Sequence, residues 1–340
     1  MGKSIRKTGT AEKNVGIFRI GAVFFVSLAI LAVLSVIALR IGSVSYSTSE
    51  ILESIFDTNS TIHTIIINLR LPRVILAILV GMCLSAAGTL LQAVMQNPLA
   101  DPGIIGVSSG ASVVATIVFL VAPTLMSSLP LLAFGGAAIA CLMIYVMAWK
   151  RGIDPTRIIL AGTAINSMLG AVSSFLTLLN ADNLQGVLSW MNGSMAAKSW
   201  SQVRILGIYG GIGLVLALLC IKPANALQLG DDMAKNLGLQ VNKMRILLSG
   251  VGAFLAASTV AVVGMIGFVG LVVPHITRLL VGSNHRVMLP TGMVIGACVV
   301  LFADTLGRTI AAPIEIPLGI IMAILGGPFF LYLLRRGRKG

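Results

Sequence analysis

Residues 96–111 read QNPLADPGIIGVSSGA and lie between two long apolar runs. The stretch holds two prolines, three glycines, an asparagine and an aspartate, a composition that a membrane-spanning helix does not need. Irregular backbone at membrane depth is tolerated only where it is packed within protein or lines a water-filled cavity. The residues alone leave two interpretations open, a tight turn between helices and an element that lines a pathway. In both, Asn97, Asp101 and Ser108 can bond nearby amide groups.

The composition of the whole chain indicates a membrane protein. Of its 340 residues, 57% are hydrophobic and only 10% are charged, whereas a soluble domain carries about 25% charged residues. Apolar segments of about 20 residues, the length of a helical span, recur along the chain. A transmembrane barrel would instead show short strands of alternating polarity. The sequence therefore predicts an all-α integral membrane protein.

Hydropathy predicts about ten spans. We expect a cytoplasmic N-terminal tail over 1–16, a transmembrane domain over 17–334 and a cytoplasmic C-terminal tail over 335–340. Within the domain the spans are expected near 17–39, 72–95, 105–122, 129–149, 157–179, 203–221, 244–264, 266–281, 289–311 and 317–334.

The basic residues indicate the orientation. With the N-terminus inside, 18 of the 24 lysines and arginines fall in cytoplasmic segments, as the positive-inside rule requires. Both termini are therefore expected in the cytoplasm. The net charge of +13 has the same explanation, so it does not indicate a nucleic-acid partner.

Two of the expected spans begin with a similar sequence. Arg73 is followed by Val-Ile-Leu-Ala and Arg245 by Ile-Leu-Leu-Ser, and each span continues into small residues and a proline-containing stretch. In the expected topology these spans run in opposite directions. Inverted repeats of this kind are typical of transport proteins.

Three arginines are expected near the outer membrane surface: Arg70 and Arg73 in LRLPR, and Arg308 one turn after Asp304. Arginine near an interface is tolerated because its long side chain reaches the polar region. Two interpretations stay open. The arginines anchor helices, with Asp304 and Arg308 paired at i, i+4, or they form an exposed basic patch for an acidic partner outside the membrane.

The longest polar interval expected in the cytoplasm spans residues 222–244. It can form a short amphipathic helix, because Asp231 and Asp232 suit a first turn and Gly238 suits the position after the last. Such an apolar stripe is typical of an element that fits into a partner's groove. The stripe consists of Leu229, Met233 and Leu237.

No common catalytic motif occurs in the sequence: there is no GxxxxGK[ST] loop, no HExxH and no Ser/His/Asp arrangement. The four cysteines lie singly in apolar runs, which indicates buried apolar side chains. Asp304 is the clearest acid within a span, so ion-coupled transport is disfavoured. We expect no cofactor, no metal site and no catalysis, and His275 is interpreted as a structural histidine. Any energy for transport would come from another chain.

Eight motifs recur in a fixed order: LRLPR at 69–73, GTLLQAVMQNPLADPGIIGVSSGA at 88–111, LAG at 160–162, LGDDMAKNLG at 229–238, GFVGLVVPHITR at 267–278, NHRVMLP at 284–290, ADTLGR at 303–308 and EIPLG at 315–319. Together they resemble the FecCD family of ABC-transporter permeases, which import ferric siderophores, haem and cobalamin. The resemblance runs from about residue 15 to the C-terminus.

The resemblance implies a type II ABC importer permease with ten spans and inverted repeats, in the bacterial cell membrane. It implies a second permease subunit, either the same chain or a paralogue, two cytoplasmic ATPase subunits and an extracellular or periplasmic substrate-binding protein. The cargo would be an iron chelate, with ferric siderophore preferred over haem and cobalamin. A stand-alone secondary carrier and a membrane receptor are the alternatives from other classes.

The resemblance also implies roles for residues. Asn97 and Leu99 match an inner gate, and Pro155 and Thr156 a second gate element, although Asp154-Pro155-Thr156 departs from the small hydroxyl residues of cobalamin permeases. Arg70, Arg73 and Arg308 match residues that receive glutamates of the binding protein. Spans five and ten, with residues 181–195, would line the pathway. The ATPase coupling residues would be Leu229, Gly230, Asp231, Asp232, Met233, Leu237 and Gly238.

Overall fold

The computed structural model describes residues 16–42, 44–57, 60–150, 153–179 and 184–337. The expected N-terminal tail, apart from Gly16, and the last three residues lie outside this part. The helices are α1 (Ile17–Arg40), α2 (Thr48–Phe56), α3 (Thr61–His63), the π-helix η1 (Thr64–Arg70), α4 (Leu71–Met95), the 3-10 helix η2 (Pro102–Ile105), α5 (Val107–Leu120), the 3-10 helix η3 (Pro123–Ser128), α6 (Leu129–Ala148), α7 (Pro155–Leu179), α8 (Leu184–Met191), α9 (Trp200–Leu219), α10 (Ile221–Gln228), α11 (Asp231–Asn236), α12 (Val241–Val263), α13 (Val269–Val281), α14 (His285–Thr309) and α15 (Leu318–Gly337).

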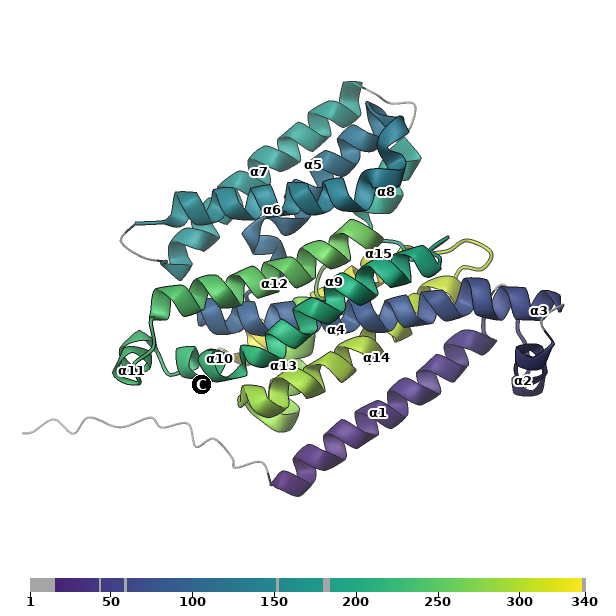
Figure 1. Cartoon of the computed structure of the whole chain (residues 1–340), viewed down its shortest axis with the longest axis horizontal. Coiled ribbons are helices and arrows are strands. Elements are labelled where there is room, and N and C mark those ends of the chain that lie inside the picture. The colour runs from purple at the N-terminus through teal and green to yellow at the C-terminus, as the bar shows by residue number, and fades with distance from the viewer. Residues whose placement is uncertain (1–15, 43, 58–59, 151–152, 180–183, 338–340) are drawn as a thin grey trace, which may run out of the picture.

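The helices confirm an all-α membrane fold. Within the described residues, seven helical segments are long and apolar enough to cross a membrane, and α5, α13 and α15 are shorter apolar helices. Together they account for the ten expected spans. The segments expected in the cytoplasm, such as α11 and the start of α12, lie at one end of the molecule, and α2 and α3 lie at the other (Figure 1). This arrangement fits the expected topology, which stays a prediction.

The second span is longer than the sequence predicted. Hydropathy placed its start near residue 72. Instead, α3, η1 and α4 form one continuous helical segment from Thr61 to Met95. Proline has no amide to donate within a helix, and the preceding turns are π-helical, with the Leu71 amide bonded to the Ile66 carbonyl. The π-helix therefore carries the backbone past Pro72.

Helices α4 and α12 form the centre of the molecule. In the most apolar stretch of the α4 segment 78% of the residues are buried, and in that of α12 72% are buried. The corresponding share for α1 is 11%. The two helices pack on each other and run in opposite directions (Figure 1). Helices α9, α13 and α14 also pack on α4, whereas α5, α6 and α7 form a second group on the other side of α12. The antiparallel pair fits the inverted repeat predicted from Arg73 and Arg245.

Glycines permit the close contacts of α4. A Cβ atom on Gly81 would overlap the Gly296 carbonyl of α14, and a Cβ on Gly88 would overlap the Gly270 backbone of α13. Small residues let membrane helices approach closely enough for their backbones to touch. Because backbone lies on both sides of each contact, neither helix can yield by a side-chain rotation.

The Gly88→Ala variant tests this packing. We expect a loss of about 1–3 kcal/mol in stability from overpacking, seen as a lower temperature of unfolding in detergent. The control is Gly207→Ala on α9, where a Cβ atom meets nothing within 4 Å. That variant should be neutral or slightly stabilising, since alanine favours helix over glycine. Equal unfolding temperatures for the two variants would contradict the close-contact argument.

Candidate functional site

The stretch 96–111 is a tight turn that bonds its own amides. Helix α4 ends at Gln96, whose φ of 48° is left-handed. The Leu99 amide donates to Asn97 Oδ1 at 2.9 Å, and the Gly103 amide donates to Asp101 Oδ1 at 2.8 Å. Asn97 and Asp101 thus act as the sequence predicted. No such bond is found for Ser108, and the neighbouring Ser109 hydroxyl donates to the Gly106 carbonyl at 3.1 Å.

This turn is also packed within the protein. Ala100, Pro102 and Ile105 are buried. A Cβ on Gly162 of α7 would overlap the Ile104 carbonyl, which places η2 directly against α7. Burial raises the pKa of Asp101, and the Gly103 amide partly opposes this shift. The turn therefore occupies fixed positions between helices rather than lying free in solvent.

A cavity of about 830 Å³ lies beside the turn. None of its lining residues is charged, and most of the polar ones are serines. The surface thus offers hydroxyl and amide groups for hydrogen bonding without a strong charge to retain a solute. Its lining comprises Gly103, Ser108, Ser109 and Ser112, then Asn166, Gly170, Ser173, Ser174, Thr177 and Leu178 of α7, and Leu184, Leu188, Met191 and Met265.

Helices α7 and α8 line this cavity. The assignment of span five and residues 181–195 to a pathway stays a prediction, and residues 181–183 lie outside the described part of the chain. Helix α15, the tenth span, does not contribute to the cavity. It carries Phe329, whose ring meets the edge of His275 on α13 at 6.3 Å between ring centres. The Nδ1 atom of His275 has no hydrogen-bond partner in the described structure, and the ring packs against Phe329.

The second predicted gate element opens α7. Asp154 accepts the Thr156 amide at 2.8 Å, which is the bond an N-cap aspartate makes, and Pro155 occupies the first helical position. Ile153, the residue before Asp154, is buried, and both of its backbone polar groups are hydrogen-bonded. Its amide donates to Asn242 Oδ1 at 3.3 Å, and its carbonyl accepts from Arg245 at 2.7 Å.

The segment expected in the cytoplasm contains the predicted short helix, α11, with Asp231 and Asp232 in its first turn. Gly230 has a φ of 93° and separates α10 from α11. At the other end the prediction is confirmed: Gly238 has a φ of 79°, and the Leu239 amide donates to the Ala234 carbonyl at 3.1 Å, the pattern of a glycine C-cap. Leu229, Met233 and Leu237 are 58%, 55% and 62% exposed, so the apolar stripe faces outward.

Asp231 connects this segment to both predicted gates. Its Oδ1 atom lies 2.8 Å from Arg245 Nη2 and accepts Gln96 Nε2 at 3.2 Å. Gln96 also donates to the Leu227 carbonyl at 2.9 Å. Because Arg245 bonds the Ile153 carbonyl, one carboxylate links the start of α11 to the end of α4 and to the entry of α7. The structure thus links the residues that precede the two predicted gates, Gln96 and Ile153, through Asp231 and Arg245.

The sequence did not reveal the role of Arg245. It predicted only a basic residue in the cytoplasm and the start of a repeated motif. Its side chain is 5% exposed. Arg245 is the last charged residue before the uncharged run that fills the rest of α12, and this position could have signalled a buried partner, because a buried guanidinium needs acceptors.

The outer arginines are anchored within the chain. Arg70 donates to the carbonyls of Leu39 and Arg40 at 2.6 and 2.8 Å, and Arg308 donates to the Ala38 carbonyl at 3.2 Å. These carbonyls lie in the last turn of α1, where a helix lacks internal donors. Arg70 and Arg308 are only 6% and 7% exposed, so an exposed basic patch made of these two residues is wrong.

Arg73 and Arg308 share the carboxylate of Asp304. Arg73 Nη2 lies 2.9 Å from Asp304 Oδ1, and Arg308 Nε lies 3.4 Å from Oδ2. Arg73 also pairs with Glu315 at 2.9 Å. The predicted i, i+4 pair of Asp304 and Arg308 is confirmed. A role of the three arginines in binding a partner stays a prediction.

The Asp304→Asn variant tests this network. Asp304 is 3% exposed, so removal of its charge leaves two arginines without their shared carboxylate. We expect a loss of about 3–5 kcal/mol, as for other broken buried pairs, measured as a lower unfolding temperature in detergent. The matched control is Glu315→Gln, because Glu315 is 43% exposed and should contribute no more than about 1 kcal/mol. A larger effect at Glu315 than at Asp304 would refute the assignment.

Known proteins resemble this chain along almost its whole length. Residues 30–336 match the model of the FecCD transport family. The Fe(3+)-citrate import system permease protein YfmE of Bacillus subtilis is 39% identical, with 90% of this chain and 92% of that protein covered. The hemin transport system permease protein HmuU of Yersinia pestis is 38% identical, with 92% and 95% covered.

A solved structure has the same fold. An inward-facing metal-chelate type ABC transporter aligns with a TM-score of 0.82 and 30% identity, covering 93% of this chain and 99% of that one. The PsaBC structure from Streptococcus pneumoniae, at 21% identity and a TM-score of 0.58, shares the fold alone.

Fold and site together define a multi-spanning membrane transport protein. The chain belongs to the FecCD transport family.

Proposed function

We propose that the chain is the permease subunit of a binding-protein-dependent ABC importer that carries an iron chelate into the cytoplasm. The observation that carries this proposal is the similarity, over nine-tenths of the chain, to permeases named for Fe(3+)-citrate and hemin import. The chain itself would catalyse no reaction, and a separate ATPase would hydrolyse ATP. The uncharged cavity beside α7 would belong to the path of the chelate.

Within this class we propose a ferric siderophore as cargo, with haem and then cobalamin as alternatives. The cavity supports a chelate without a strong charge, because its lining carries no charged residue and its exposed surface is mostly apolar, with serine, threonine and asparagine side chains between. The lining contains no histidine, tyrosine or cysteine that would retain haem iron.

The partners follow from the exposed elements. The apolar stripe of Leu229, Met233 and Leu237 is proposed to enter a cleft on one of two cytoplasmic ATPase subunits. A second permease subunit, a copy of this chain or a paralogue, would complete the pathway, and an extracellular or periplasmic binding protein would deliver the chelate. Of the three outer arginines, Arg73 is the candidate for docking, because its partner Glu315 is itself 43% exposed.

We further propose that Asp231 transmits the motion of the ATPase to the gates. A shift of α11 moves a carboxylate that holds Gln96 at one gate and, through Arg245, Ile153 at the other. Asn97 and Leu99 would narrow the first gate, and Pro155 and Thr156 the second. A small shift suffices when packed elements have two discrete arrangements.

Reconstitution tests the proposed function. Proteoliposomes that contain this chain, its ATPase and a binding protein should accumulate radiolabelled iron from a ferric siderophore only with internal ATP. The control is the same preparation with an ATPase that cannot hydrolyse ATP. Uptake driven by an ion gradient without the ATPase would contradict an ABC permease, and ATP-driven uptake of haem but not of siderophore would correct the cargo alone.

The Asp231→Asn variant tests the link between α11 and the gates. It keeps an oxygen for Gln96 but loses the ion pair with Arg245, so we expect chelate uptake per ATP hydrolysed to fall several-fold. Glu53→Gln is the control, because that exposed carboxylate lies on α2, at the opposite end of the molecule from α11. Uptake and hydrolysis are measured on the same vesicles. An equal ratio for both variants would exclude Asp231 as the link.

A further inference from the structure

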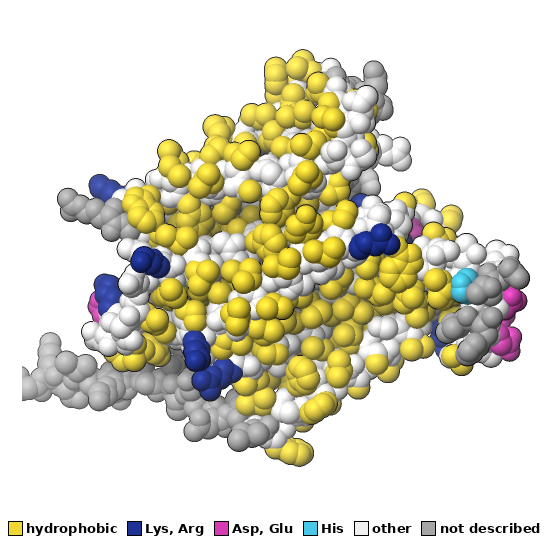
Figure 2. All heavy atoms as spheres, in the orientation of Figure 1, with side chains coloured by type: hydrophobic (Ala, Val, Ile, Leu, Met, Phe, Trp, Pro, Cys, Tyr) yellow, Lys and Arg dark blue, Asp and Glu magenta, His cyan; other side chains and the backbone are white. Residues whose placement is uncertain are grey.

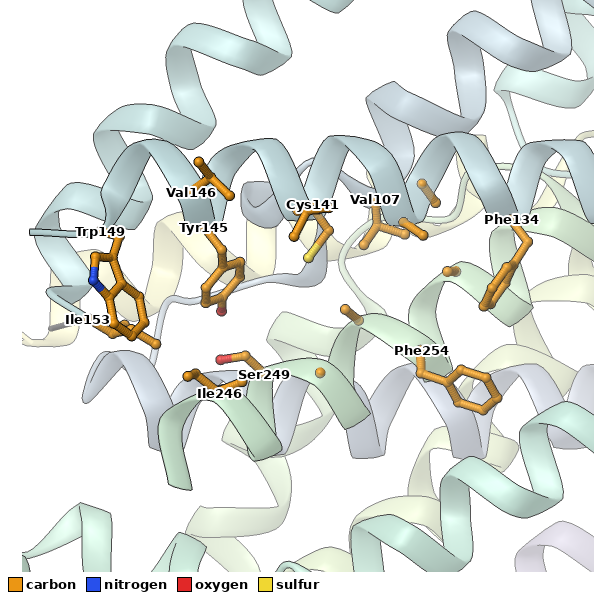
Figure 3. Close-up of a pocket in the computed structure, with 16 residues that line it drawn as sticks. Val107, Phe134, Cys141, Tyr145, Val146, Trp149, Ile153, Ile246, Ser249 and Phe254 are labelled. Carbon is orange, nitrogen blue, oxygen red and sulfur yellow. The ribbon is translucent and has the colours of Figure 1, made fainter. Parts of the chain in front are cut away.

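A groove of about 650 Å³ runs between α6 and α12, away from the cavity beside α7 (Figure 3). Its walls are almost wholly apolar. Leu142, Val146 and Ile246 belong to its rim and are 64%, 57% and 46% exposed, so the groove opens on the outside of the molecule. In the same orientation, the face over α6 and α12 is covered by apolar side chains (Figure 2).

The cytoplasmic end of the groove meets a second, polar pocket. Ile153 lines both, and the polar pocket has a volume of about 580 Å³. Its charged lining residues are Lys150, Lys235, Lys243, Arg245, Asp154 and Asp231. An apolar slot at membrane depth is thus continuous with a basic pocket at its cytoplasmic mouth.

The charges of this pocket do not balance. Asp231 pairs with Arg245, Asp154 with Arg157, and Lys235 with Asp232. Lys150 and Lys243 have no ion pair among the described residues, and both are exposed. Two cations at the mouth of an apolar groove complement an anion that carries an apolar chain.

The aromatic residue at the junction fits the same ligand. Trp149 follows the last residue of α6, lines the groove and is 53% exposed. Tryptophan prefers the level of the lipid headgroups. Deeper in the groove, the hydroxyls of Tyr145 and Ser249 project toward each other from α6 and α12 (Figure 3). Ser249 is 2% exposed, so these hydroxyls lie beneath the apolar surface of the groove.

We propose that the groove and the basic pocket together bind one anionic phospholipid of the cytoplasmic leaflet. Its phosphate lies beside Lys150 and Lys243, and an acyl chain lies along α6 and α12. Basic pockets between helices on the cytoplasmic side are suited to such headgroups. The site is independent of the transported chelate, and it borders the Ile153–Arg245 contact at the entry of α7.

Fluorescence quenching tests the headgroup preference. The full chain is placed in vesicles that mix unlabelled phosphatidylcholine with brominated phosphatidylglycerol or brominated phosphatidylcholine, and the Trp149 signal is the difference from a Trp149→Phe variant. We expect phosphatidylglycerol to bind at Trp149 about tenfold more strongly than phosphatidylcholine at low salt. The preference should weaken with salt and fall to about one in Lys150→Gln/Lys243→Gln. Lys222→Gln/Arg286→Gln should keep it, because both side chains are exposed and neither lines the basic pocket. Equal binding of the two lipids to the wild-type chain would overturn the proposal.

A second variant tests the groove itself. Gly250 lines it, and a Cβ atom there meets nothing within 4 Å, so Gly250→Leu fills the groove without a backbone clash. We expect quenching of Trp149 by brominated acyl chains to drop markedly. Gly207→Leu on α9 is the matched control, because its Cβ also meets nothing within 4 Å. Unchanged quenching in a correctly folded Gly250→Leu variant would show that no acyl chain occupies the groove and would refute the site.

Discussion

The close backbone contacts of α4 hold the rest of the structure in place. With no Cβ at Gly81 and Gly88, α4 touches the backbones of α14 and α13, and this packing fixes both of its ends. At the outer end Arg73 meets Asp304 on α14. At the inner end Gln96 meets the segment that leads into α11. A helix packed backbone to backbone cannot deform gradually, so a displacement at one end is passed on as a rigid shift.

The two central helices, α4 and α12, each have an arginine paired with a carboxylate near their first turn, at opposite ends of the molecule. A buried guanidinium opens each of them, Arg73 in α4 and Arg245 in α12, and each is paired with a carboxylate from another element, Asp304 or Asp231. A charge at the end of a membrane helix is costly unless it is paired and hydrogen-bonded. The pairing therefore fixes which loop sits at each helix entrance. At the outer end the network joins α4 to α14, and at the inner end it joins α12 to α11.

Hydropathy predicted the fold well because a bilayer imposes one rule on every span: apolar side chains and internally bonded backbone. The ten segments, the antiparallel repeat and the glycine C-cap at Gly238 all follow from local patterns. The predictions failed where a residue far away in the sequence determines the local structure or the burial of a side chain. The second span begins at Thr61 rather than near residue 72, because α3 and η1 lead directly into α4. Arg70 and Arg308 are not exposed, because the end of α1 offers carbonyls that no local pattern reveals. Arg245 looked like an ordinary cytoplasmic charge until Asp231 and Ile153 were placed beside it.

The conformation of Gln96 is the last step in this argument. A side chain other than glycine with a φ of 48° costs energy of order 1 kcal/mol, and such positions persist only when surrounding contacts require them. Glycine would end α4 at this point without strain. Glycine, however, has no side-chain amide that could donate to the Leu227 carbonyl and to Asp231. The two hydrogen bonds of the Gln96 side chain therefore offset the strain of its backbone. One residue later, Asn97 begins the turn that borders the cavity beside α7. Gln96 therefore joins the segment before α11 to the turn whose later residues, Gly103 and Ser108, line that cavity.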